Sequence, residues 1–227
     1  MSRVLVTAVF GAAFVGVCLT AVERFDALFA NPDTRHFAVA GYWALKTAIV
    51  GAFCLFVALR DPAREPSRNP VAFLACATAM GAIVLLREPS QDAGTTAVLV
   101  GDFVALVACA WLLASVLTLG RCFGVLPEVR GLVTRGPYRL VRHPVYLGEF
   151  GTAVGLVIGA PSLWNFGAVF AFVLAQVTRM RLEEQALRKE FAEYAEYESR
   201  TPRLLPRVPR PRRVTAPPPA AKRVWGV

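Results

Sequence analysis

The chain has few residues of the kinds that bind metals. It contains two histidines and five cysteines among 227 residues, and no pair of them has the spacing of a zinc site. The sequence therefore predicts no metal centre. Four of the cysteines fall inside apolar runs, which favours a role as small packing residues.

Charge is also scarce, since 18% of the residues are charged and 56% are hydrophobic. This balance excludes an ordinary soluble domain. The apolar runs cover residues 4–22, 37–59, 71–86, 97–119, 145–159 and 163–178. A membrane span needs roughly 20 apolar residues, so the last two runs are short and predict a helical hairpin that turns at Pro161-Ser162. We therefore predict an all-α membrane protein with six crossings, counting the hairpin as two.

The basic residues are distributed unevenly over these crossings. Six crossings place 21 of the 25 Arg and Lys residues on one side, and only Arg24, Arg35 and Arg87 on the other. Because basic loops stay in the cytoplasm, both termini are expected there. Topology and attraction to anionic lipid headgroups account for the net charge of +9, so no nucleic-acid partner is predicted. The Arg- and Ala-rich composition is typical of a bacterium, which indicates the inner membrane.

Three regions follow from this division. Residues 1–119 form the predicted four-helix transmembrane region, 120–206 the catalytic region with its membrane hairpin, and 207–227 a basic, Pro-rich tail expected to be disordered. The linker 120–144 is long for a segment with so little helical pattern, which is unusual unless it has a function. Its apolar residues predict that part of it packs under the spans or against the membrane face.

Residues with special backbone or chemical properties concentrate in Arg135-Gly-Pro-Tyr-Arg-Leu-Val-Arg-His-Pro-Val-Tyr-Leu-Gly148. Gly136-Pro137 predicts a turn, and Pro144 predicts the first residue of a helix with His143 just before it. The unpaired amides of such a helix start suit a carboxylate. In the alternative interpretation, His143 merely caps the helix and Arg142 reaches lipid headgroups.

A second block follows the hairpin. It consists of Glu183-Glu184, Phe191, Tyr194, Tyr197, Arg200, Pro202 and Pro206. Residues 179–199 are expected to continue the last helix. Glu183 lies on one stripe with Leu187, whereas Glu184 stands four residues before Arg188 and fits a surface ion pair.

Both blocks, in this order and spacing, resemble the paired signature of the isoprenylcysteine carboxyl methyltransferase and phospholipid methyltransferase family. In that family, Arg-His-Pro-x-Tyr and a later Glu-Glu frame S-adenosylmethionine. The resemblance covers about residues 117–206 and implies that Arg142 and Arg200 lie near the reacting methyl group. The cofactor-binding residues that it implies are Tyr138, His143, Pro144, Tyr146, Gly148, Glu183 and Glu184.

The resemblance implies an integral-membrane methyltransferase that acts on a lipophilic or membrane-associated acceptor. A carboxylate acceptor is already ionised and needs a cation to position it, which two arginines would supply. An amine or thiol would need a base, for which His143 is the candidate, and arginines also suit a lipid phosphate.

Two other classes of function stay open. The first is a non-catalytic membrane sensor or scaffold that keeps the fold. A transporter comes third, because the spans lack the duplicated broken-helix pattern of transporters. Lys46 and Asp102 fall inside spans, where a structural pair is favoured over a transport pathway.

Overall fold

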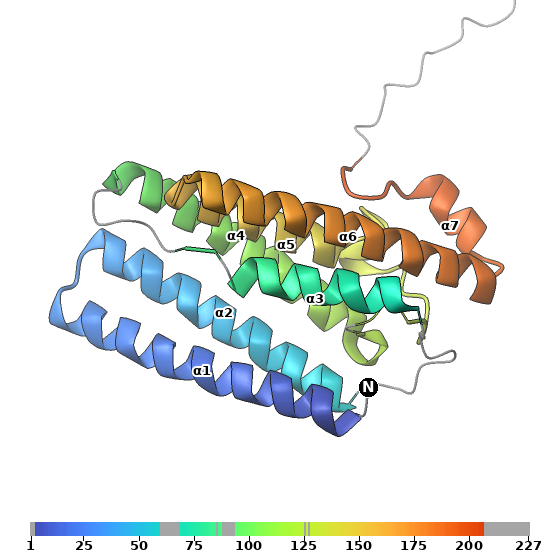
Figure 1. Ribbon diagram of the computed structural model, residues 1–227, viewed down its shortest axis with the longest axis horizontal. Helices are drawn as coiled ribbons and strands as arrows, with labels where there is room; N and C mark the ends of the chain where they lie inside the picture. Colours follow the sequence, from blue (N-terminus) through green and yellow to red (C-terminus); the bar gives the residue numbers. More distant parts are fainter. Residues whose placement is uncertain are drawn as a thin grey trace, which may run out of the picture.

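The computed structural model describes residues 3–59, 69–84, 86–87, 94–124, 126 and 128–206, and the regular structure of these residues is entirely helical. The all-α prediction is thereby confirmed for the described chain (Figure 1). The α-helices are α1 (Arg3–Ala30), α2 (Thr34–Leu59), α3 (Pro70–Val84), α4 (Thr95–Leu119), α5 (Pro144–Gly159), α6 (Leu163–Glu190) and α7 (Tyr194–Arg200). Two short 3-10 helices, η1 (Gly120–Cys122) and η2 (Gly136–Arg139), lie in the linker.

The first six α-helices correspond to the six apolar runs and pass back and forth between two ends of the molecule (Figure 1). Among the described residues, Thr96–Cys122 and Leu163–Glu190 are long and apolar enough to cross a membrane. Pro70–Ala79 and Pro144–Gly159 are shorter apolar segments. Six crossings therefore stay a prediction. The Lys46 side chain and the 207–227 tail lie outside the described residues, so their predicted roles stay predictions as well.

Helices α4 and α5 touch through their backbones. A Cβ added to Gly155 would lie 2.6 Å from both the amide nitrogen of Ala105 and the carbonyl oxygen of Gly101. One added to Gly148 would lie 2.7 Å from the Cβ of Leu112. Small residues allow this approach, as they do where helices pack in membranes. The contact fixes the direction of α5, and with it the position of His143 at the helix start.

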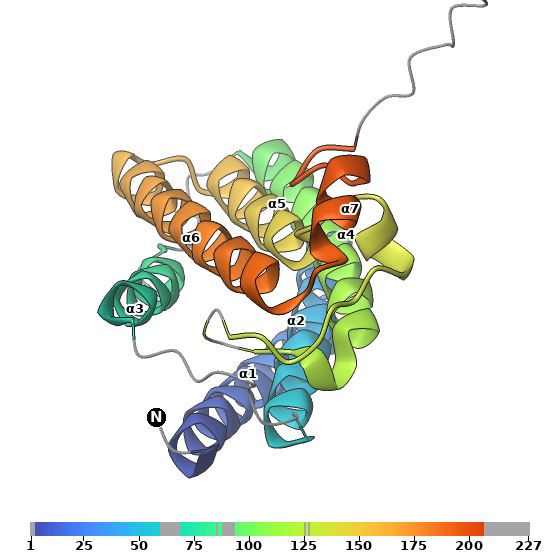
Figure 2. The same cartoon turned by 90° about the vertical axis from the view of Figure 1, so that its right-hand side faces the viewer.

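Helix α6 begins after Ser162, whose hydroxyl oxygen accepts a hydrogen bond from the backbone amide of Asn165 at 3.1 Å. It packs against α3, which lies beside it (Figure 2). The prediction of a continuous helix over 179–199 is wrong at one point. The chain leaves the helix at Phe191, and α7 begins at Tyr194. This break lets α7 reach the linker, where the hydroxyl of Tyr197 donates to the carbonyl of Tyr138 at 2.7 Å.

Candidate functional site

A cavity of about 220 Å³ lies at the end of the bundle where α5 begins. The linker, α5, α6 and α7 enclose it. The charged and aromatic residues that line it are Phe123, Glu128, Arg130, Tyr138, Arg142, His143, Tyr146, Glu149, Arg179, Glu183, Tyr194 and Tyr197. The apolar part of the cavity wall includes three linker residues, Leu126, Leu132 and Val133. This confirms that part of the linker packs under the helices.

The local structure around His143 follows the sequence closely. Gly136 has a φ of +57°, a conformation that favours glycine, and Pro137 is the next residue of η2. Pro144 is the first residue of α5, and His143 occupies the N-cap position with non-helical backbone angles and makes no side-chain capping hydrogen bond. Both the predicted turn and the predicted helix start are therefore confirmed. His143 is buried, with 3% of its surface exposed.

The backbone amides before α5 are engaged by the chain that follows α7. The amide of Arg142 donates to the carbonyl of Pro202 at 2.8 Å, and that of His143 donates to the carbonyl of Arg203 at 3.1 Å. These two amides are thus not open to an anion, and the predicted carboxylate site at the helix start stays a prediction for the amides that follow Pro144. Residues 202–203 instead lie against the cavity wall at Arg142 and His143.

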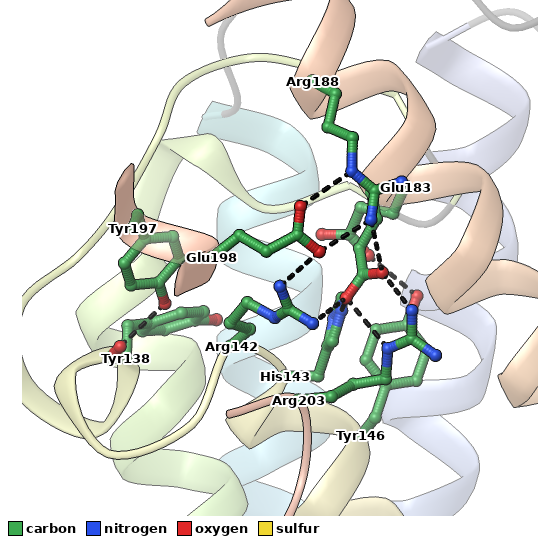
Figure 3. Close-up of polar contacts among 10 residues, drawn as sticks. Tyr138, Arg142, His143, Tyr146, Glu183, Arg188, Tyr197, Glu198 and Arg203 are labelled. Carbon is green, nitrogen blue, oxygen red and sulfur yellow. Dashed lines mark hydrogen bonds and ion pairs between the residues drawn. The ribbon is translucent and has the colours of Figure 1, made fainter. Parts of the chain in front are cut away.

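Glu184 is the centre of the charged network beside the cavity. Its partners Arg142, His143, Arg188 and Arg203 are labelled in Figure 3. The Oε1 of Glu184 lies 3.0 Å from Nε2 of His143 and 3.2 Å from a terminal nitrogen of Arg142. Arg203 binds both carboxylate oxygens, with its Nε 3.0 Å from Oε1. Arg188 lies 3.6 Å from Oε2, so the predicted pair exists, but only 1% of the Glu184 side chain is exposed. The prediction of a surface pair is therefore wrong, because the cations around Glu184 compensate a buried carboxylate.

Glu198 on α7 completes this network. It accepts two hydrogen bonds from Arg188, at 2.8 and 2.7 Å, and lies 2.5 Å from a terminal nitrogen of Arg142. The hydrogen bonds from Arg188 lower the pKa of the Glu198 carboxyl below its usual value. Arg142 therefore bridges α6 and α7 through their carboxylates while it also faces the cavity.

Glu183 faces the cavity, unlike its neighbour. It accepts a hydrogen bond from the hydroxyl of Tyr146 at 3.0 Å and lines the cavity together with Leu187, as the stripe predicts. Tyr194, also in the cavity wall, is 1% exposed, and in the described part of the chain its hydroxyl has no hydrogen-bond partner. Burial raises the pKa of Tyr194 above its usual value, so this hydroxyl stays neutral.

Sequence reasoning missed a polar cluster at the α5–α6 side of the cavity. Arg179 lies 5.2 Å from the ring centre of Tyr146 and donates to the side-chain oxygen of Gln176 at 2.6 Å. Gln176 in turn donates to Glu149. Gln176, Arg179 and Glu183 follow the spacing i, i+3 and i+7. That spacing places them on one face of α6 and was the available signal.

The predicted site residues fall into two groups. Tyr138, Arg142, His143, Tyr146 and Glu183 line the cavity. Pro144, Gly148, Glu184 and Arg200 are not among its lining residues.

Each residue of the second group has a different position. The carbonyl of Pro144 accepts from the indole of Trp111 at 2.9 Å. Gly148 contacts Leu112, and Glu184 stands behind His143. Arg200 pairs with Glu196 at 2.9 Å and has 69% of its side chain exposed.

A family comparison covers most of the residues that form the cavity. Residues 90–194 match the family model described as phospholipid methyltransferase. The nickel-cobalt-cadmium resistance protein NccN of Alcaligenes xylosoxydans xylosoxydans is 34% identical over 110 residues, which cover 46% of this chain and 51% of that protein. The cobalt-zinc-cadmium resistance protein CzcN of Cupriavidus metallidurans is 35% identical over 108 residues, which cover 45% and 50%. The chain spans about half the length of these curated relatives.

Proposed function

Because residues 90–194 match the family model described as phospholipid methyltransferase, we propose that the protein is an integral-membrane methyltransferase. It moves the methyl group of S-adenosylmethionine to a lipophilic or membrane-associated acceptor. The observation that carries this proposal is the cavity, in which Arg142 and His143 from the first sequence block meet Glu183 and Tyr194 from the second. It lies at one end of apolar helices, where an acceptor held in a membrane can approach.

The residues of the cavity fit S-adenosylmethionine. Carboxylates attract a cationic centre, and Glu183 and Glu149 both line the wall. The unpartnered hydroxyl of Tyr194 offers a hydrogen bond to a ligand, and the rings of Tyr138 and Tyr197 offer aromatic surface. Bound there, the cofactor would supply a methyl group on a sulfonium. These chain residues would hold it and keep water out of the cavity.

The acceptor chemistry is constrained by the cationic groups of the wall. The Nε of Arg142 is buried without a hydrogen-bond partner among the described residues, and Arg179 adds a second guanidinium. Both suit a carboxylate or phosphate on the acceptor. An amine or thiol would need His143 to take a proton, and the Nε2 of His143 is already bonded to Glu184. We therefore favour an anionic acceptor group.

Both relatives are named for resistance to cobalt and cadmium, together with nickel in one and zinc in the other. If this chain contributes to such resistance, we propose that it does so through its methylated product. The described residues hold no group of three or more His, Cys, Asp or Glu side chains that could bind a metal ion.

Titration of the full-length protein with S-adenosylmethionine, followed by calorimetry, separates this proposal from a scaffold that keeps the fold without the cofactor. We expect Tyr194→Phe to weaken cofactor affinity about five- to tenfold while the unfolding temperature stays unchanged, because a hydroxyl without a protein partner stabilises only the ligand. Equal affinities of Tyr194→Phe and the parent would remove the hydroxyl from the site. Absence of binding by the parent would favour the scaffold.

The two predicted catalytic arginines should respond differently to lysine. Arg142→Lys is expected to reduce turnover at saturating cofactor about ten- to a hundredfold, because a point charge replaces a planar group that spans two carboxylates. This range corresponds to about 1.5–3 kcal/mol for a charged hydrogen bond. Arg200→Lys serves as the matched control and should stay within about twofold of the parent, since Arg200 is exposed. A large loss in Arg200→Lys would return that residue to the reacting centre.

A further inference from the structure

A second hollow, of about 580 Å³, lies between α3 and α6, which run side by side in Figure 2. Its wall is almost entirely apolar and is built largely from small residues. Among the residues that form it are Gly81, Ala82, Leu163, Trp164, Gly167 and Ala171. Hollows of this size and polarity commonly hold small apolar ligands or parts of them.

A fixed cation stands beside this groove. The guanidinium of Arg87 lies 4.6 Å from the ring centre of Trp164, one of the lining residues. The backbone of Arg87 is held by Asn165, which is 1% exposed. The amide of Arg87 donates to the Asn165 side chain at 2.9 Å, and that side chain donates back to the Arg87 carbonyl at 3.0 Å. A buried residue thus holds the backbone of an exposed arginine whose guanidinium lies over Trp164.

The groove and the cavity of the candidate site lie near opposite ends of α6. Trp164 and Glu183 are separated by 19 residues of α6, or about 28 Å of helix. The hydrocarbon core of a bilayer is about 30 Å thick. If Glu183 stands near one membrane surface, Trp164 and Arg87 stand near the other, where tryptophan and arginine meet lipid headgroups.

We propose that this groove binds one anionic phospholipid from the leaflet opposite the cavity. An acyl chain of this lipid occupies the apolar groove between α3 and α6, and Arg87 binds its phosphate. The positive charge of Arg87 beside the apolar groove favours an anionic lipid as the occupant. Without that charge, the groove would suit a second copy of the chain equally well. The proposal is independent of the methyl-transfer reaction.

The glycines of the groove allow a direct test. A Cβ added to Gly167 meets nothing within 4 Å, so a side chain can start there, and Gly167→Leu is expected to fill the hollow. Gly16 on α1 also faces open space, which makes Gly16→Leu a matched control. Arg87→Gln removes the charge and leaves the two backbone hydrogen bonds to Asn165 in place. Thermal unfolding of each variant checks that it folds like the parent.

The full-length protein, in detergent with equal amounts of phosphatidylglycerol and phosphatidylcholine, is then examined by native mass spectrometry. The parent and Gly16→Leu should retain one phosphatidylglycerol with about tenfold preference. Arg87→Gln should lower that preference to about twofold, and Gly167→Leu should retain neither lipid. Unchanged preference in Arg87→Gln or unchanged retention in Gly167→Leu would overturn the proposal. A parent dimer that Gly167→Leu separates would instead assign the groove to a second copy.

Discussion

Full-length protein with Glu184→Gln is expected to unfold at a clearly lower temperature than the parent and to bind S-adenosylmethionine at least tenfold more weakly. The substitution removes the carboxylate that the buried Arg142 and His143 share, and among the described residues it leaves Arg142 with Glu198 alone. Breaking one partner of a buried pair costs about 3–5 kcal/mol. We expect the lower end of this range, since Arg188 and Arg203 are 46% and 39% exposed and can turn to water. Thermal unfolding and calorimetric titration of the same preparation measure both effects.

The neighbouring glutamate supplies the control. Glu183→Gln keeps an oxygen that can accept from the hydroxyl of Tyr146, and Glu183 has no comparable set of cations around it among the described residues. Its unfolding temperature should therefore stay close to that of the parent, while cofactor affinity falls about tenfold. If both variants unfold like the parent, Glu184 is not the centre of the network.

Gly155→Leu is expected to prevent folding of the bundle. A side chain at this position would meet the backbone of α4 at 2.6 Å, and backbone atoms cannot move aside as the end of a flexible side chain can. Overpacking of this kind exceeds the usual 1–3 kcal/mol, and we expect a loss of at least about 4 kcal/mol. Size-exclusion profiles and circular dichroism after extraction in mild detergent would show it. Gly16→Leu, in open space on α1, should behave like the parent, and a folded Gly155→Leu would contradict the close α4–α5 contact.

The helices were predictable because their signal is local. The apolar run 97–119 became Thr95–Leu119, and 145–159 became Pro144–Gly159. A long run with few charged residues predicts the body of each helix, and Pro144 predicts the start of one. The break at 191–193 was not predictable in this way, since the apolar spacing of Leu187, Phe191 and Tyr194 continues across it. The break is favoured by the hydrogen bond between Tyr197 and the linker. This is a tertiary contact, so the local sequence does not predict it.

The site was predictable in part. Resemblance to a family identified Tyr138, His143 and Glu183, which the structure brings to one cavity. The spacing of residues along α6 could not show whether Glu184 is buried or pairs with Arg188 at the surface. The partner that buries it, His143, stands 41 residues earlier in the chain. The same limit hid Arg203, which reaches Glu184 only after α7 turns the chain back.

Transfer of a labelled methyl group from S-adenosylmethionine is the most direct test of the proposed activity. The full-length protein in membranes is offered prenylcysteines, isoprenoid acids, aminophospholipids and small thiols. We predict label in a lipid-soluble product of an acceptor with an anionic group. Arg200→Lys should match the parent in this assay, and Glu183→Gln should lose at least nine-tenths of the signal at limiting cofactor. The parent must first be shown to bind the cofactor. If it then transfers no more label than Glu183→Gln to any of the acceptors, the result would contradict the methyltransferase assignment.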